Sequence, residues 1–215
     1  MRTIHKGQEP RSLTEHRRSS RDDFTADYEN YREKDDLRAS LAAEQGYICC
    51  YCMQRIRPTR EGMKVEHWHC QSNYGDEQLR YGNLLGACLG NKGQPRTYQH
   101  CDTYKEDADL SRNPAEPSHR VEELVQYLGN GCIVSSNGEF DREMNEVLNL
   151  NHPYLVEGRK KALEGFKMGL SKRGTIGKDT LNRMIEKLCE TTGSKGLEPF
   201  CGVIVYWLRK RLARI

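Results

Sequence analysis

The sequence predicts a protein of the α+β class, in which a small cysteine-rich centre with short strands is embedded in a mainly α-helical chain. Three observations lead to this prediction. Six of the nine cysteines fall between residues 49 and 101, short β-type runs occur in the same segment, and apolar residues recur at helical spacing over most of the chain after residue 140. At 215 residues the chain is long enough to bury a core of its own.

The chain divides into three expected parts. Residues 1–45 should form an N-terminal arm with helices, residues 46–112 the cysteine-rich centre, and residues 113–215 a β-hairpin and a C-terminal helical region. Within the first part, residues 13–45 favour two helices with a break near Asn30, because their apolar residues recur at helical spacing.

Two short strands are expected in the centre, at residues 47–51 and 63–67, because both runs combine β-branched or aromatic residues with other apolar ones. Pro58 and Gly62 lie between these runs and are typical turn residues. The segment 71–82 is polar and contains two glycines, so we expect it to be a loop.

In the last part, Asn130-Gly131 is the turn chemistry of a β-hairpin, so one extra hairpin is expected between residues 121–128 and 132–135. The final helix carries Trp207 among residues that we expect to be core, and it closes on a basic run that can neutralise phosphates or form a solvated face. That run is Arg209, Lys210, Arg211 and Arg214. Helical patterns are expected at about 101–110, 140–148, 153–172, 177–191 and 198–213.

Bulk composition limits the classes of protein to consider. Charged residues make up 30% of the chain, and no run approaches the roughly 18 apolar residues of a membrane span. The first residues lack the apolar core of a secretory signal, so we expect a cytoplasmic protein with no membrane partner. Disulfides do not persist in that reducing compartment, and clustered cysteines there indicate metal binding or a reactive thiol. The net charge of +3 is compatible with a nucleic-acid partner.

Four cysteines of the centre form a candidate structural zinc site, because zinc prefers four sulfur or nitrogen ligands in a tetrahedron. The set is Cys49, Cys52, Cys88 and Cys101. Cys50 is an alternative to Cys49, and His100 is an alternative to Cys101. A redox function for the C-x-x-C pair would require the start of a helix in a βαβ pattern, which the surrounding sequence does not resemble.

A second group of residues in the centre suggests catalysis. An imidazole titrates near neutral pH, so His67 is a candidate general base. Glu66 and Asp102 are hard oxygen ligands suited to Mg²⁺ or Mn²⁺. Such an ion, held between two carboxylates, would act as a Lewis acid in phosphodiester hydrolysis.

The order of these residues resembles the HNH nuclease family, whose zinc-containing ββα-metal centre carries the same pattern. The matching residues are Cys49-x-x-Cys52, Glu66-His67, Asn83-Leu84, Cys88 and Cys101-Asp102-x-x-Lys105. The resemblance implies a zinc-stapled ββα-metal fold for residues 46–112, in which the catalytic ion is Mg²⁺ or Mn²⁺.

The same resemblance assigns a role to each catalytic position. Glu66 matches the metal-binding acid, and His67 matches the general base. Asn83 matches the asparagine that braces the loop carrying the histidine. Asp102 stands where the family completes its metal site, and Lys105 matches a basic residue that could contact a substrate phosphate.

Two features depart from the family pattern. Cys70 replaces a proline in the loop after the base, and the usual C-x-x-C-N is split, with Asn91 near Cys88 and the Cys101-Asp102 pair ten residues later. Asn91 is therefore an alternative to Asp102 at the catalytic metal.

Further segments resemble the HNH proteins of retron and Septu-type antiphage systems. They are the opening Ile4-His-Lys-Gly-x-Glu-Pro-x-Ser-Leu13, Glu66-His67-Trp68, His100-Cys101-Asp102 and Leu148-Asn-Leu-Asn151. This resemblance implies a complex with an ABC-like ATPase and, in retrons, with a reverse transcriptase and its multicopy single-stranded DNA.

The sequence therefore predicts a metal-dependent HNH endonuclease that acts as the effector of a bacterial antiphage defence system together with a partner ATPase. Two alternatives stay open. The same site could cleave RNA such as tRNA, since a ribose 2′-OH could serve as the nucleophile for the same base. The chain could also be a non-catalytic zinc-stapled module that binds a partner or nucleic acid.

Overall fold

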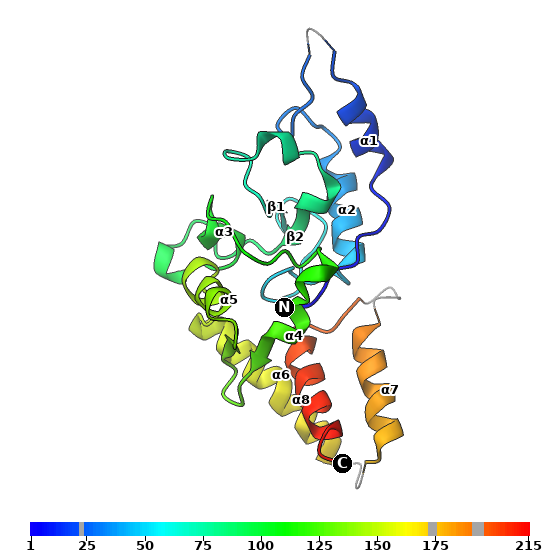
Figure 1. The fold of residues 1–215 in the computed structure, drawn as a ribbon, viewed down its shortest axis with the longest axis vertical. Helices are drawn as coiled ribbons and strands as arrows, with labels where there is room; N and C mark the ends of the chain where they lie inside the picture. Colours follow the sequence, from blue (N-terminus) through cyan, green and yellow to red (C-terminus); the bar gives the residue numbers. More distant parts are fainter. Residues whose placement is uncertain (22–23, 172–175, 191–195) are drawn as a thin grey trace.

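The computed structural model describes residues 1–215 apart from 22–23, 172–175 and 191–195. The protein is of α+β type, as expected, with helices surrounding two small antiparallel sheets (Figure 1). The helices are α1 (Arg11–Arg18), α2 (Lys34–Glu44), α3 (Asp102–Lys105), α4 (Val121–Leu124), α5 (Gly138–Arg142), α6 (Pro153–Ser171), α7 (Lys178–Cys189) and α8 (Cys201–Leu212). The strands are β1 (Lys64–His67), β2 (Leu84–Ala87), β3 (Val125–Tyr127) and β4 (Ile133–Ser135).

The N-terminal part contains two helices, α1 and α2, separated by a long connection that includes the expected break at Asn30. Helix α2 buries Leu37, Leu41 and Ala42, the apolar positions that share one helical face, and packs against β2. Residues before α1 run alongside α2 toward the centre of the molecule (Figure 1).

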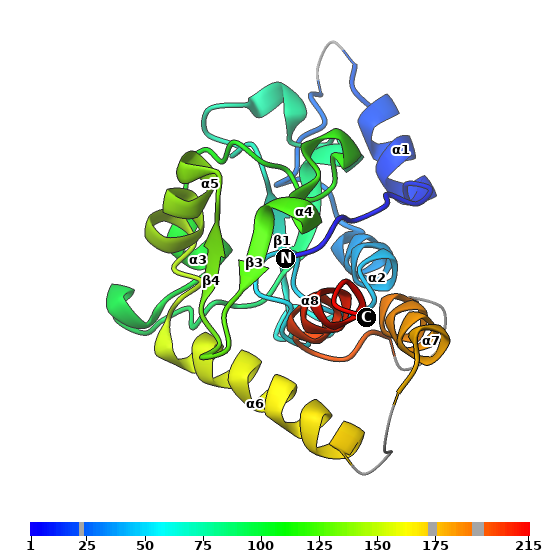
Figure 2. The same cartoon turned by 60° about the horizontal axis from the view of Figure 1, so that its bottom comes forward.

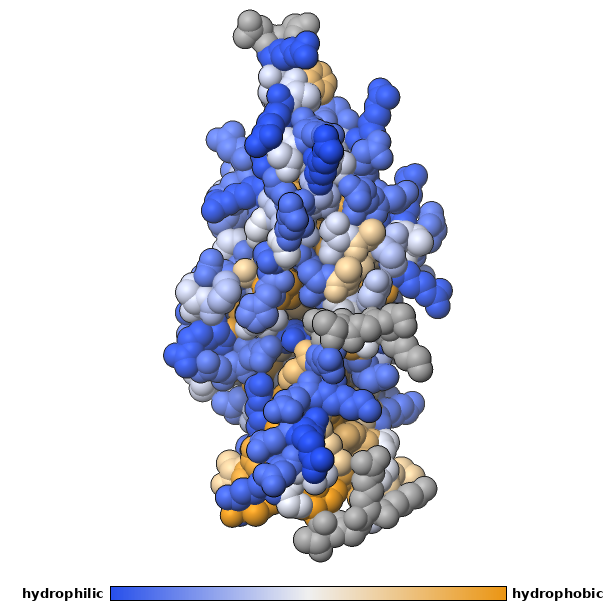
Figure 3. Space-filling model, turned by 90° about the vertical axis from the view of Figure 1, so that its right-hand side faces the viewer, coloured by the Kyte–Doolittle hydropathy of each residue, from blue (hydrophilic) through white to orange (hydrophobic). Residues whose placement is uncertain are grey.

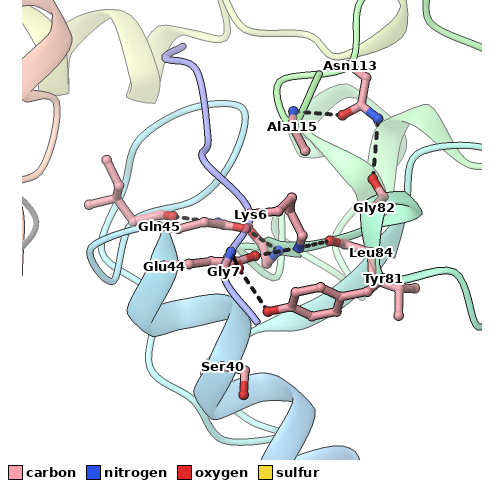
Figure 4. A network of polar contacts seen from close by, with 12 residues as sticks. Lys6, Gly7, Ser40, Glu44, Gln45, Tyr81, Gly82, Leu84, Asn113 and Ala115 are labelled. Atoms are coloured by element: carbon pink, nitrogen blue, oxygen red, sulfur yellow. Dashed lines mark hydrogen bonds and ion pairs between the residues drawn. The ribbon is translucent and has the colours of Figure 1, made fainter. Parts of the chain in front are cut away.

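A buried polar network fastens this N-terminal part to strand β2 (Figure 4). The ammonium of Lys6 pairs with Glu44 at the end of α2 and donates to the backbone oxygen of Leu84 at 2.9 Å. Next to them the Gln45 amide bonds both backbone groups of Gly86, at 2.8 and 2.7 Å. Tyr81 donates to Glu44 at 2.8 Å. Strand β2, which pairs with the strand that carries Glu66 and His67, is thus held in place by hydrogen bonds from the end of α2 and from Lys6.

Strands β1 and β2 pair antiparallel, with Glu66 opposite Leu85 and His67 opposite Leu84. The expected strand at 47–51 is wrong, since that segment makes only one isolated bridge, between Ile48 and Arg55. The reason is the C-x-x-C turn: Tyr47 and Met53 on either side of it have φ of 59° and 64°, which curls the backbone instead of extending it. Strand β2, all of whose residues are buried, was not expected from the sequence.

The expected hairpin after residue 113 is present but shorter, with β3 paired to β4 and the segment before β3 forming the single turn of α4. Gly131 in its turn has φ of 92°, and a Cβ at this position would lie 2.3 Å from the backbone oxygen of Val156. Only glycine therefore allows the hairpin to sit against α6.

Four of the expected helices are present near their predicted positions, as α5 with a following π-turn (Glu143–Val147), α6, α7 and α8. The predicted ends at residues 172 and 191 lie outside the described residues. The helix expected at 101–110 is limited to α3. Helix α8 packs against both α6 and α7 (Figure 2). Among the described residues, no helix combines the length and apolar character that crossing a membrane requires.

Candidate functional site

Four buried cysteines converge within the cysteine-rich centre, residues 46–112. The Sγ atoms of Cys49, Cys52, Cys88 and Cys101 all lie within 4.8 Å of one another, so this group can hold a metal ion. It is the one such convergence of three or more His, Cys, Asp or Glu ligands in the part of the chain that the structure describes. Cys50 and His100, the two alternative ligands, lie beside the group and are not members of it.

The local backbone explains why these thiols meet. The Met53 amide donates to the Cys49 oxygen at 3.1 Å and the Cys49 amide to the Gln54 oxygen at 2.8 Å, which closes the C-x-x-C segment into a tight turn. Gly90, which has φ of 54°, passes so close to the backbone of His100 that a Cβ would lie 2.1 Å from its oxygen. This close approach brings the segment after β2 against the segment that carries Cys101.

Charge within the thiol group also favours a cation. Burial raises the pKa of Cys101 well above its usual range, whereas the neighbouring thiols, Cys101 foremost, outweigh burial and hold the pKa of Cys49 well below it. Without a metal ion, the Cys49 thiolate is thus stabilised by hydrogen bonds from the neighbouring thiols, which keep their protons. A metal ion would allow the remaining thiols to ionise as well.

Two carboxyl groups meet next to strand β1. Glu66 projects from β1 and Asp102 from the first turn of α3, and the two carboxyl groups contact each other. Burial raises the pKa of Glu66 well above its usual range, and the neighbouring Asp102 raises it further. Lys105 lies 3.1 Å from Glu66, and Lys64 pairs with Asp102. The two carboxyls therefore form a compact acidic pair whose charge is balanced by two lysines.

His67 follows Glu66 on β1 and is buried, with 6% of its surface exposed. Its Nε2 lies 3.0 Å from the backbone oxygen of Gln78. Because a carbonyl oxygen only accepts, Nε2 must carry the proton, which leaves Nδ1 as the nitrogen able to take one up. Burial lowers the pKa of His67 to about 4, so the imidazole is neutral at neutral pH. Tyr28 packs edge-on against the ring, with a centroid distance of 4.6 Å.

Asn83 ties down the loop that follows His67. Its Oδ1 accepts from the amide of His69 at 2.8 Å, and its Nδ2 donates to the oxygens of His69 and Glu77 at 3.0 and 3.3 Å. The side chain of His69 continues this arrangement by bonding Glu77 at 2.8 Å. One buried amide thus ties His69 to Glu77, the residue directly before Gln78, whose carbonyl oxygen orients His67.

Lys105 does not lie where a phosphate contact requires it. Its side chain is fully buried, and its ammonium contacts Glu66 and donates to the His67 oxygen at 3.3 Å. The single turn of α3 directs it toward β1, so in this structure it neutralises the acidic pair and faces no solvent. Asn91, the alternative to Asp102, is exposed and donates to Tyr98 at 2.8 Å, away from Glu66.

Several residues around the site were missed by the sequence analysis. Lys64 precedes Glu66 by two positions on the same strand, and this period-two spacing could have placed both on one face. Tyr51, whose hydroxyl donates to Glu66 at 2.7 Å, and Tyr28 carry no local signal of their role. The orienting carbonyl of Gln78 could not be recognised either, since every residue has one.

Together, the site provides a neutral imidazole whose Nδ1 can accept a proton, near a pair of touching carboxyls, and the same centre contains a buried thiol group able to hold a metal. Such an arrangement can accept a proton and bind a hard cation. Comparisons with known proteins do not assign the chain to a family: no protein-family model matches it, and no curated protein matches it significantly.

Proposed function

We propose that this protein is a metal-dependent endonuclease of the HNH type that hydrolyses phosphodiester bonds of nucleic acid. The observation that carries the proposal is the placement of neutral His67, with Nδ1 available, directly after Glu66 on β1, whose carboxyl touches Asp102. A general base and two hard oxygen ligands are the protein groups that metal-assisted phosphodiester hydrolysis requires.

The four-cysteine group fits zinc as its structural ion. Zinc–sulfur bonds of about 2.3 Å in a tetrahedron place the sulfurs about 3.8 Å apart. The Sγ atoms of Cys49 and Cys101 are separated by 3.9 Å, and those of Cys52 and Cys88 by 3.7 Å. Four buried thiols leave no position for water or substrate, so the proposed role of this zinc is to hold the centre together.

The acidic pair fits a hard divalent cation such as Mg²⁺ or Mn²⁺. Glu66 and Asp102 offer carboxylate oxygens from two different elements, and both already pair with a cationic side chain, that of Lys105 or Lys64. When bound there, such an ion would neutralise charge on the phosphoryl and leaving oxygens. Glu66, Asp102 and the four cysteines are the residues to which we assign metal binding.

The remaining steps belong to the protein's own side chains. Nδ1 of His67 takes the proton of the attacking water. Nε2 keeps its own proton and donates a hydrogen bond to the Gln78 oxygen, which fixes the orientation of the ring. Asn83 holds the loop that carries this oxygen. Tyr51 and Lys105 hold the carboxyl of Glu66 from the inside of the protein.

For the biological role, we propose that the nuclease is the effector of a bacterial antiphage system and acts in a complex with an ABC-like ATPase. This proposal rests on the sequence resemblance alone. The substrate is DNA or RNA such as tRNA. If the acidic pair and His67 do not catalyse, the same chain is a zinc-stapled module that binds a partner or nucleic acid.

Cleavage assays separate these candidates. Purified protein, alone and with a candidate ABC-like ATPase partner, is incubated with supercoiled plasmid and with total tRNA in Mg²⁺ or Mn²⁺. We expect His67→Ala to reduce cleavage by about 10²–10⁴-fold while leaving the melting temperature near that of the natural protein. His5→Ala is the matched control, because His5 is exposed. Equal cleavage by both variants would exclude His67 as the base.

A further inference from the structure

A second chemically distinctive surface lies between α6 and α8. It is a groove of about 370 Å³ that is also bordered by the hairpin turn after β3. We call this cavity the basic groove. Its lining includes Tyr127 from β3 and, from α6 and the C-terminal end of the chain, Lys167, Tyr206, Trp207, Lys210, Arg211 and Arg214. No acidic residue contributes to the lining within the described part of the chain.

The cations of the basic groove lack a carboxylate partner among the residues that the structure describes. Other surface cations do form ion pairs, as Arg120 does with Glu123. Within the described residues, none of the ion pairs involves Lys167, Lys210, Arg211 or Arg214. Four like charges that converge without counter-charges repel one another, and a polyanion relieves that repulsion.

Two aromatic rings stand among these charges. The ammonium of Lys167 lies 5.4 Å from the ring centre of Trp207, and the guanidinium of Arg211 lies 5.6 Å from it. The ammonium of Lys210 lies 5.3 Å from the ring of Tyr206. Both rings are half-buried, and Trp207 is supported by an edge contact with Phe166. The groove therefore combines fixed aromatic surfaces with cations that reach solvent.

The basic groove is separate from the candidate catalytic site. In Figure 1, α6 and α8 occupy the lower end of the molecule, whereas β1 and β2 lie in its upper half. The cations of the groove come from α6, α8 and the residues just after α8, whereas Glu66, His67 and Asp102 are contacted by Tyr51, Gln78, Lys64 and Lys105. A ligand bound there is held away from the acidic pair.

We propose that the basic groove is a binding site for single-stranded nucleic acid, with its phosphates on Lys167, Lys210, Arg211 and Arg214 and its bases against Trp207 and Tyr206. Cations that track a backbone, interleaved with aromatic rings for stacking, are the chemistry that binds unpaired strands. A duplex already stacks its bases on one another and offers no free faces to these rings. An acidic peptide would satisfy the cations but would leave both rings unused.

Binding is tested without cleavage. The anisotropy of short labelled oligo(dT) and oligo(U) is measured in buffer free of added divalent ions, so the result does not depend on the proposed nuclease activity. We expect the double variant Lys210→Gln/Arg211→Gln to bind at least tenfold more weakly. The slope of log affinity against log salt concentration should fall by about 1.4, because each single-strand contact contributes about 0.7.

The matched control removes two exposed charges from another helix, as Lys178→Gln/Arg183→Gln on α7. This control should bind like the natural protein. Equal weakening in both double variants would overturn the proposal, because it would show that only net charge matters.

Tryptophan fluorescence tests the stacking. The chain has two tryptophans, so Trp68→Phe leaves Trp207 as the reporter. Oligo(dT) should quench its emission, and a duplex of equal length should not. Equal quenching by the duplex, or quenching by oligoglutamate and not by oligo(dT), would assign the groove to another partner and overturn the proposal.

Discussion

The centre of the protein and its C-terminal helices are stabilised in different ways. In the centre, β1, β2 and α3 are four residues long each, and the buried side chains include Glu66, His67, Asn83 and Lys105. In the C-terminal unit, α6, α7 and α8 have 19, 12 and 12 residues and share an apolar core. Figure 3 shows apolar side chains gathered at that lower end, while the upper part is hydrophilic.

The difference has a physical cause. Strands and helices of a single turn gain little stability from their own hydrogen bonds, and buried polar groups oppose folding unless each is paired. The centre therefore depends on its thiol group and its ion pairs. The C-terminal helices bury Leu163, Leu181, Leu208 and other apolar side chains and need no such support.

Loss of the proposed zinc site should have the largest effect, and it should affect the centre far more than the C-terminal helices. Cys52→Ser, or treatment with a strong chelator, should unfold the centre, since binding of a structural zinc contributes on the order of 10 kcal/mol to folding. Most of the helical circular dichroism of α6–α8 should remain. Zinc content is checked by a colorimetric assay, with Cys132→Ser, outside the thiol group, as the control. An apo protein with an unchanged melting curve would contradict the assignment.

Lys105→Met should have the next largest effect. Its ammonium is the buried partner of Glu66, and removing one partner of a buried ion pair costs about 4 kcal/mol in the free energy of unfolding. Urea denaturation measures the loss. A surface phosphate contact would instead change substrate affinity with almost no change in stability, so the experiment decides between the two roles.

Leu208→Ala tests the other region. Leu208 is fully buried in the core of the C-terminal helices, and the cavity left behind should cost about 3 kcal/mol. Zinc content should stay the same, because the thiol group lies in another part of the core. Thermal unfolding followed together with zinc release distinguishes the regions; loss of zinc from the folded variant would show that they are not independent.

The smallest effect is expected at the surface. Arg11 and Glu15 form a pair one helical turn apart, with 90% and 60% of their side chains exposed. Arg11→Ala should therefore change the free energy of unfolding by only about 0.3 kcal/mol. A shift in melting temperature as large as that of Leu208→Ala would indicate a contact that this structure does not contain.

The helices were largely predictable, because helical spacing of apolar residues is a local property of the chain. The four cysteines could be chosen in advance for a similar reason, since their residue type and clustering restrict their chemistry. Strand β2 was not predictable, because a run of four apolar residues becomes a strand only by pairing with β1. At residues 47–51 the error was the opposite one: a strand was predicted where none forms, because the C-x-x-C turn overrides the β-type composition of the segment.

By itself, the sequence determined the residue types of the site and their order along the chain. Only the tertiary structure decided that Lys105 points inward, that the Gln78 carbonyl selects the tautomer of His67, and that cations from α6 and α8 share one groove. Each of these facts depends on contacts between segments far apart in sequence. Such contacts are set by the packing of the whole chain and leave no pattern in any one segment.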